Sequence, residues 1–320
     1  MSGKKFICTY FDYNFLPRGL ALYYSVKLHH EDFDFYVLPF DSQTYDYLSK
    51  LNEPHIKLIP VEEYDAYFQT SRSKFTDNKQ YYFTATPNIC IYLFEKFPEI
   101  DILLYLDADV YVFNSLDPVY EEFGDSCIGF CTHRLHPLIN LYAKSYGKYN
   151  VGVNLFRNSE TGQRCLKEWK DNCDNWFSGQ PGYKLNFFSD QIFLDDWLEK
   201  YDGAKIIGNI GVNVCHWNAV NYRFRKKGDS FYVNDKPLII YHFSSLRKED
   251  DYRWNANSIY AFVSIRKVLL EIYRKYIGHI ESFGISNRKW EKINHKETFR
   301  KRIFHSVMKL FLNEIIIWKS

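Results

Sequence analysis

The sequence predicts an α/β protein with a mainly parallel sheet flanked by helices. Short apolar runs alternate with helical patterns over the first 250 residues, which is typical of parallel strands joined by helical crossovers. The chain has 320 residues, 46% of them hydrophobic, so it can bury one large core. It contains no run of about 18 apolar residues, and no membrane-spanning helix is therefore predicted.

The apolar runs and helical patterns follow one another in a definite order. Strands are expected at 5–10, 33–40, 56–61, 101–113, 126–133, 150–158, 204–208 and 237–243, and helices at 16–30, 86–97, 115–123, 159–177 and 189–201. Ser159 and Ser189 are the expected N-caps of the last two helices. Pro87 is expected in the first turn of its helix, where proline is tolerated.

The end of the chain differs from the rest in charge. From residue 259 onward there are 13 Lys and Arg against 5 Asp and Glu, or about +8, in a chain with a net charge of +2. We therefore predict a catalytic domain over 1–250 and a basic helical extension over 251–320. Apolar residues at helical spacing follow the basic triplet 300–302. A membrane-surface contact through residues 300–318 and packing against the domain or a dimer partner both remain open.

Composition also restricts location and partners. The seven cysteines are scattered and include no CxxC pair, so a disulfide framework or zinc site is not expected. The N-terminal residues lack the apolar stretch of a signal peptide. A cytoplasmic location is expected, on the inner face of the membrane if the basic segment binds lipid. The mildly acidic body and the lack of a nucleic-acid-binding motif predict that no nucleic acid is bound.

Two carboxylates follow a strongly apolar run in "LLYLDADVYVF" (103–113). Asp107 and Asp109 are two residues apart, so they point the same way from an extended chain and repel each other unless a cation lies between them. Carboxylate oxygens are hard ligands suited to Mn²⁺ or Mg²⁺. At the carboxyl end of a buried strand, this pair is the expected anchor for a metal–nucleotide diphosphate.

Two other interpretations of the pair are open. Solvated turn aspartates are the simpler one. A phosphohydrolase of the haloacid dehalogenase type also carries D-x-D after an apolar strand, with the first aspartate as nucleophile. About 100 residues of α/β pattern precede Asp107, and this placement counts against the phosphohydrolase.

Four later segments appear in a fixed order: "KYNVGVNLFRNSETG", "FSDQIFLDDW", "VCHWNAVNY" and "LIIYHFSSL". With the D-x-D, this set resembles glycosyltransferase family 8 and related nucleotide-diphospho-sugar transferases of the glycosyltransferase A fold, over residues 4–246. The resemblance implies a metal-dependent transfer of sugar, with retention, from a nucleotide diphosphate to a glycan or lipid-linked acceptor. A UDP-sugar is the expected donor. A non-catalytic sugar-nucleotide-binding protein on the same fold is the remaining alternative.

The resemblance also implies roles for particular residues. It implies a metal site made by Asp107, Asp109 and His242, catalytic roles for Asp190, Gln191 and Asn150, and nucleotide-sugar contacts from Thr9, Tyr10, Asp107, Ala108, Gly152 and Asn218. His133 and Arg134 also match patterned positions. Thr86 stands where relatives often have lysine. Since the late motif lacks the family's glycine and lysine, Arg247, Lys248 or the metal alone is expected to meet the leaving phosphate.

Overall fold

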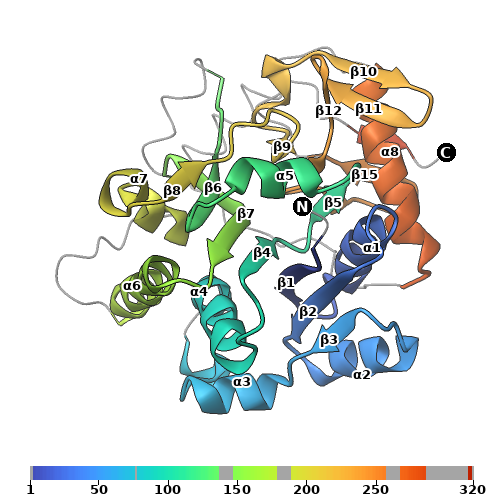
Figure 1. Ribbon diagram of the computed structural model, residues 1–320. Coiled ribbons are helices and arrows are strands. Elements are labelled where there is room, and N and C mark those ends of the chain that lie inside the picture. The colour runs from blue at the N-terminus through green and yellow to red at the C-terminus, as the bar shows by residue number, and fades with distance from the viewer. Residues whose placement is uncertain are drawn as a thin grey trace, which may run out of the picture.

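The computed structural model describes residues 3–75, 78–136, 147–178, 189–256, 267–285 and 316–318. A seven-stranded sheet lies at the centre of the protein, with helices on both faces (Figure 1). Its strand order is β3 (Ile56–Leu58), β2 (Phe33–Pro39), β1 (Lys5–Phe11), β4 (Ile102–Leu106), β7 (Tyr149–Arg157), β6 (Ile128–Thr132) and β8 (Ala204–Ile206). Only β7 runs antiparallel to its neighbours, so the predicted mainly parallel sheet is confirmed.

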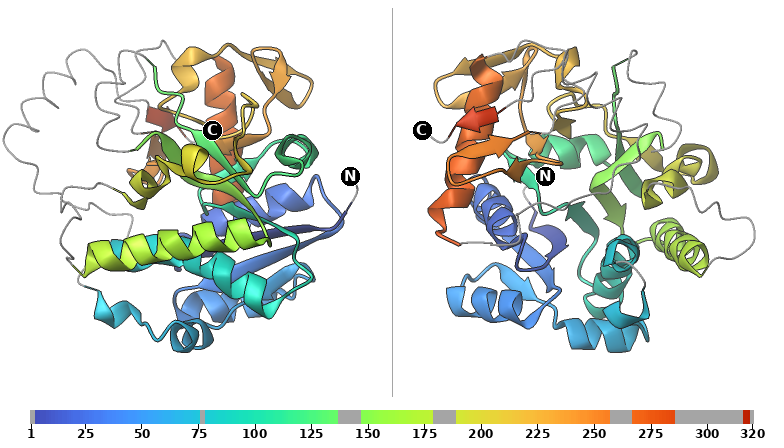
Figure 2. Two further views of the ribbon diagram at one scale, coloured as in Figure 1. Left: turned by 60° about the vertical axis from the view of Figure 1, so that its left-hand side comes forward. Right: turned by 180° about the vertical axis from the view of Figure 1, so that it is seen from behind.

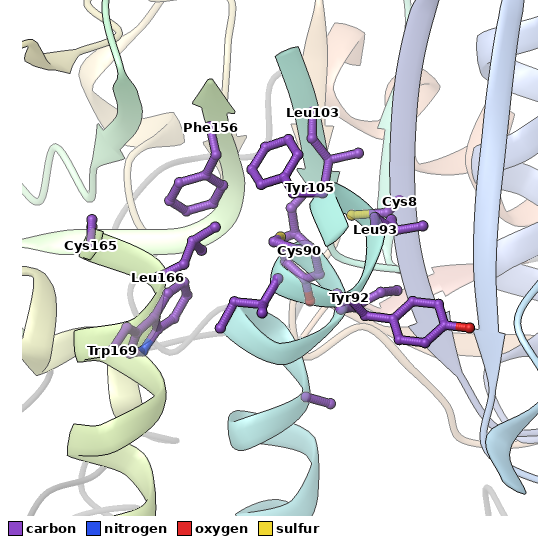
Figure 3. Close-up of a cluster of buried hydrophobic side chains, with 14 of the residues drawn as sticks. Cys8, Cys90, Tyr92, Leu93, Leu103, Tyr105, Phe156, Cys165, Leu166 and Trp169 are labelled. Atoms are coloured by element: carbon purple, nitrogen blue, oxygen red, sulfur yellow. The ribbon is translucent and has the colours of Figure 1, made fainter. Parts of the chain in front are cut away.

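Each face of the sheet has its own set of helices, because successive strand residues point to opposite sides. In β4, Leu103 and Tyr105 join one apolar cluster, and Leu104 and Leu106 join the other. The first cluster is covered by α3 (Val61–Tyr67), α4 (Asn78–Lys96), α6 (Glu160–Phe177) and α7 (Trp197–Lys200), and the second by α1 (Leu16–Lys27), α2 (Ser42–Leu51) and α5 (Asp117–Phe123). Figure 3 shows Tyr105 on the side of α4, with Leu166 and Trp169 of α6 nearby.

A small second sheet extends the carboxyl edge of the first. It contains β5 (Val110–Val112), β13 (Ile240–His242) and β9 (Val214–Cys215), with β13 between the other two. β5 begins directly after the two aspartates and runs antiparallel to β13, pairing Val110 with His242. The end of β13 therefore lies next to the D-x-D.

The remaining elements surround this second sheet. They are the hairpin strands β10 (Phe224–Lys227), β11 (Ser230–Val233) and β12 (Lys236–Pro237), the strands β14 (Arg247–Lys248), β15 (Arg253–Asn255) and β16 (Ile316–Trp318), and the 3₁₀ turns η1 (Arg72–Lys74), η3 (Asp190–Leu194) and η4 (Ala219–Asn221). Among the described residues, no helix is long and apolar enough to cross a membrane. All seven cysteines are free.

Helix α8 (Lys267–Ser282) lies beyond the predicted domain boundary near residue 250 and packs against the body of the protein. Figure 2 shows it beside α1. Ile272, Tyr276 and Ile280 share one buried cluster with Tyr111 of β5 and Tyr241 of β13. The division of the chain at residue 250 stays a prediction.

Three local predictions need correction. Helix α4 begins at Asn78, so Pro87 lies inside the helix and not in its first turn. The missing N–H removes the bond to the carbonyl of Phe83, and burial between the sheet and α6 offsets that loss. Segment 189–201 is not one helix, because the 3₁₀ turn η3 precedes the four-residue α7. Its predicted cap is confirmed, since the Ser189 hydroxyl accepts from the Gln191 N–H at 3.3 Å.

The third correction concerns the end of the predicted basic helix. Ile316–Trp318 forms β16, antiparallel to β15. Two β-branched residues and an aromatic residue favour a strand, and the edge of β15 supplies the backbone hydrogen bonds. The rest of the predicted membrane contact, residues 300–315, lies outside the described residues.

Candidate active site

Three side chains next to the ends of three strands converge at the carboxyl edge of the sheet. Asp107 follows β4, Asp109 lies one residue before β5, and His242 ends β13. The His242 Nε2 atom is 3.1 Å from Asp109 Oδ1 and 3.7 Å from Asp107 Oδ2. One ligand atom from each residue lies within 4.8 Å of the other two. The structure thus brings the three predicted metal ligands together.

This donor set fits a divalent cation. Adjacent ligands of an octahedral ion with bonds of 2.0–2.1 Å are about 3 Å apart, close to the separation of His242 Nε2 and Asp109 Oδ1. Two carboxylates and an imidazole suit Mn²⁺ as well as Mg²⁺. Among the described residues, this is the one group of three acidic, histidine or cysteine side chains placed to hold a metal.

Asp109 lies on the cationic side of the site. Burial opposes its charge, but His242 and Arg18 outweigh burial and lower its pKa. Arg18 Nη1 is 3.6 Å from Asp109 Oδ2. Burial likewise opposes charge on His242, but the two carboxylates raise its pKa. The two carboxylates therefore favour the charged form of the imidazole.

Asp107 lies on the side of the site that is farther from Arg18 and closer to Tyr105 and Asp190. Burial raises its pKa, and the charge of Asp109 adds to this effect against the opposing influence of His242. The Tyr105 hydroxyl donates to Asp107 Oδ1 at 2.8 Å. Successive strand residues point to opposite faces, so Tyr105 and Asp107, two residues apart, lie on the same face. Their spacing in the sequence is therefore consistent with this contact.

Gly152 leaves room for the His242 ring. A Cβ atom at this position would lie 2.6 Å from His242 Cε1 and 2.7 Å from Nδ1. The carbonyl of Gly152 accepts from the Asp107 N–H at 3.0 Å, and its N–H donates to Asn150 Oδ1 at 3.1 Å. The N-x-G-V segment of β7 therefore supports two of the predicted metal ligands, Asp107 and His242.

Asp190 is fully buried next to this group. Its Oδ1 accepts from the Ser189 hydroxyl at 3.1 Å, and its Oδ2 has no partner within the described part of the chain. Burial, with a contribution from the charge of Asp107, raises the pKa of Asp190 to about 7. Gln191 follows in η3 and is also buried. A buried carboxyl with an unbonded oxygen is suited to a polar ligand.

The end of β1 lies at the same edge. Thr9 is fully buried, and its hydroxyl has no partner among the described residues. The Tyr10 hydroxyl donates to the carbonyl of Tyr82 and lies 2.8 Å from Thr86 Oγ1. The Tyr10 ring packs 5.8 Å, between centroids, from that of Tyr105. Thr86 thus helps to hold the Tyr10 hydroxyl at the end of β1.

Asn218 and Arg134 have structural contacts that the sequence did not reveal. Asn218 accepts from the Cys215 N–H at 2.9 Å and donates to the carbonyls of His133 and Asn213, both at 3.1 Å. Arg134 donates to the carbonyls of Asn209, Val212 and Asn213. His133 is buried, which lowers its pKa to about 4. These side chains stabilise the loops that surround the site, and a ligand contact from Asn218 stays a prediction.

The two cations expected near the leaving phosphate are already paired. Arg247 Nε is 2.9 Å from Glu249 Oε1, and Lys248 Nζ is 2.7 Å from Glu281 Oε1. Arg18, which approaches Asp109 from the first turn of α1, is a site residue that the sequence pattern did not predict. A charged residue in the otherwise apolar segment "LPRGLAL" was the available signal. Ala108, between the two aspartates, is buried.

The sequence identifies the class of protein to which this site belongs. Residues 6–248 match the family model described as glycosyl transferase family 8. Two Bacillus subtilis (strain 168) proteins are also similar. YfnD is 23% identical over 82% of this chain and 84% of its own length, and YfnF is 27% identical over 75% and 81%.

Solved structures agree at the level of the fold. The galactosyltransferase LgtC, in complex with donor and acceptor sugar analogues, superposes with a TM-score of 0.56, 16% identity, and coverage of 89% of this chain and 98% of LgtC. An active-site mutant of LgtC gives a TM-score of 0.51 at 17% identity with the same coverage. The chain belongs to glycosyl transferase family 8, has the glycosyltransferase A fold and is a glycosyltransferase. The phosphohydrolase and non-catalytic alternatives are therefore wrong.

Proposed function

We propose that this glycosyltransferase moves a sugar, with retention, from a UDP-sugar to a hydroxyl of a glycan or lipid-linked acceptor, and that the reaction needs Mn²⁺ or Mg²⁺. The convergence of Asp107, Asp109 and His242 is the observation that carries the proposal. LgtC, whose fold this chain shares, has been solved with donor and acceptor sugar analogues.

Asp107, Asp109 and His242 would hold the cation. When bound, a divalent ion neutralises the negative charge that develops on a departing diphosphate, which is worth several kcal/mol. Tyr105 orients Asp107 through its hydroxyl, and Gly152 gives the His242 ring the space to face both carboxylates.

Asp190 and Gln191 are the residues that we assign to the sugar. A carboxyl group with a pKa of about 7 holds a proton part of the time at neutral pH, so it can donate a hydrogen bond to a sugar hydroxyl or accept one. Gln191 would present its amide oxygen to the anomeric carbon as positive charge develops there. Asn150 would line the same pocket, since its side chain lies beside Gly152.

Thermal stabilisation by sugar nucleotides tests the donor and the metal together. UDP-, GDP- and CDP-sugars are added with Mn²⁺, with Mg²⁺ or with EDTA. A ligand at 100 times its dissociation constant stabilises the folded state by about 2.7 kcal/mol. We expect stabilisation by a UDP-sugar only with the metal, and none in Asp109→Asn. Equal stabilisation in EDTA would contradict metal dependence.

Product analysis tests the rest of the proposal. The anomeric configuration of the product, read by NMR, should match that of the donor; inversion would contradict the stereochemistry. The basic segment 300–318 favours an acceptor at a membrane surface. Co-sedimentation with vesicles containing anionic lipid should therefore exceed that with neutral vesicles. Equal recovery from both would favour a soluble glycan acceptor.

A further inference from the structure

Arg18 is a buried charge in the first turn of α1. The residue is 2% exposed. Its Nη1 lies 3.6 Å from Asp109 Oδ2, and its Nη2 donates to the carbonyl of Leu246. A buried guanidinium costs several kcal/mol unless it is paired and hydrogen-bonded. Its place beside a metal ligand suggests a function in the site.

Leu246 belongs to the turn that follows His242. In this turn the Phe243 N–H donates to the carbonyl of Asp109 at 2.8 Å, and the Leu246 N–H donates to the carbonyl of Phe243 at 3.1 Å. Ser245 has a φ of 63°, which a non-glycine residue adopts only when its surroundings require it. The turn is therefore tied to Asp109 at both of its ends. Phe243 at its start bonds the Asp109 backbone, and Leu246 at its end is linked to the Asp109 side chain through Arg18.

The two oxygens of Asp109 have different partners. Oδ1 faces His242 at 3.1 Å, and Oδ2 faces Arg18. A carboxylate held from both sides cannot rotate freely about its last bond. The guanidinium thus holds the carboxylate in the orientation in which Oδ1 faces His242.

Helix α8 closes the other side of this arrangement. The Tyr276 ring stacks on Phe243 with 3.9 Å between centroids and 13° between planes. Tyr276 is fully buried and lies within electrostatic range of both Arg18 and Asp109. Gly19 allows α1 to approach β1, because a Cβ there would lie 2.3 Å from the Phe11 ring. The guanidinium is therefore enclosed between α1, the turn after β13 and α8.

We propose that Arg18 is a positioning residue that fixes the Asp109 carboxylate and the 243–246 turn in the geometry that binds the divalent cation. This inference rests on the proposed function. A role through charge alone makes the opposite prediction, because removing a cation close to a metal site should strengthen metal binding. A positioning role predicts weaker binding, since residues that orient metal ligands typically contribute 10–100-fold in affinity.

The experiment measures Mn²⁺ binding to the full chain by calorimetry and by electron paramagnetic resonance. Arg18→Met keeps the apolar stem and removes the guanidinium, and Arg18→Lys keeps the charge but not the two-sided contact. Arg225→Met is the matched control, because Arg225 of β10 forms an exposed ion pair with Asp235, which lies between β11 and β12. We expect Arg18→Met to weaken Mn²⁺ binding about tenfold and broaden the spectrum of the bound ion. Arg225→Met should match the wild type.

Arg18→Lys decides the outcome if Arg18→Met does not fold. It should weaken binding several-fold in spite of its retained charge, and wild-type affinity would overturn the inference. Wild-type or tighter binding by a folded Arg18→Met would also overturn it and leave the proposed function intact. If the wild-type protein itself binds no Mn²⁺, the metal-dependent function fails, and this inference fails with it.

Discussion

Asp107 and Asp109 are two residues apart, yet they lie in different surroundings. Asp109 faces His242 and Arg18, and these cations lower its pKa in spite of burial. Asp107 faces the hydroxyl of Tyr105 and lies near the buried Asp190, and burial together with the Asp109 charge raises its pKa. The site therefore has a charged side and a side on which protons are held more tightly.

Under the proposed metal-dependent function, this difference would separate two tasks of the D-x-D. A carboxylate with fixed cationic partners stays ionised and keeps the site ready for a metal. A carboxylate with a raised pKa binds a cation in competition with protons up to a higher pH than an ordinary carboxylate does. The following substitutions test how far the two sides differ, from the largest expected effect to the smallest.

Replacing Asp190 tests the proton-holding side. The pKa of Asp190 is about 7, against about 3.9 in an unfolded chain, so its neutral form contributes stability that is complete below pH 3.9 and is lost as the pH rises through 7. Asp190→Asn has no such loss. We compare the free energies of unfolding of Asp190→Asn and the wild type without metal. From pH 4 to pH 8 the difference between them should change by roughly 4 kcal/mol in favour of Asp190→Asn.

Urea unfolding in EDTA at several pH values measures this difference. Asp174→Asn is the control, because Asp174 lies on α6 in a partly exposed ion pair with Lys170. Its stability should follow the wild type with pH. A constant difference between Asp190→Asn and the wild type would show that Asp190 titrates normally.

Exchanging each aspartate for asparagine compares the two sides directly. Both Asp107→Asn and Asp109→Asn should lose metal-dependent transfer. Only Asp109→Asn leaves the buried Arg18 without its carboxylate, which should lower the free energy of unfolding of the metal-free protein by about 3 kcal/mol. Asp107→Asn removes a repulsion and should not destabilise. Equal destabilisation in chemical unfolding would mean that the two surroundings are equivalent.

Gly152→Ala tests whether the His242 ring needs its present position. The new Cβ would lie 2.6 Å from the ring, so the imidazole must move, and Mn²⁺ affinity should fall about tenfold. The control is Gly278→Ala in α8, where nothing lies within 4 Å of the added atom. Calorimetric titration of both variants with Mn²⁺ measures the difference. Unchanged affinity in Gly152→Ala would show that His242 is not a required ligand.

Tyr105→Phe should have the smallest effect. In the wild type, the hydrogen bond from Tyr105 favours the ionised form of Asp107, so its loss should raise the pKa of Asp107. The pH at the midpoint of Mn²⁺ binding should therefore rise by less than about one unit. Tyr111→Phe is the control, since the Tyr111 hydroxyl bonds His279 and not an aspartate. A downward shift would contradict the role given to Tyr105.

Most of the fold could be predicted from the sequence because it follows from local pattern. Apolar runs such as 5–10 and 33–40 predicted β1 and β2, and Ser159 marked the start of α6. Pro87 was placed in a first turn because proline is normally excluded from helix interiors. A long buried helix can tolerate the lost bond, and only the tertiary structure shows that α4 is such a helix.

The part of the site that could be predicted consists of metal-binding residue types next to the ends of apolar strands. Asp107, Asp109 and His242 each lie at or next to the end of a strand, and the structure brings them together. Arg18 was missed because its contacts reach 91 residues along the chain to Asp109 and 228 to Leu246. Asn218 has an ordinary loop position in the sequence, and its three internal hydrogen bonds depend on how the loops around the site fold back.

The stacking of Phe243 on Tyr276 shows that the core around the turn after β13 includes residues beyond the family match. The match to the family stops at residue 248, while the ring that covers the turn after β13 comes from α8, nearly 30 residues later. A chain cut at the end of the match would expose Tyr111, Tyr241 and Phe243 to water. Such a surface invites aggregation. Helix α8, which lies beyond the family match, therefore supplies part of the core around these three rings.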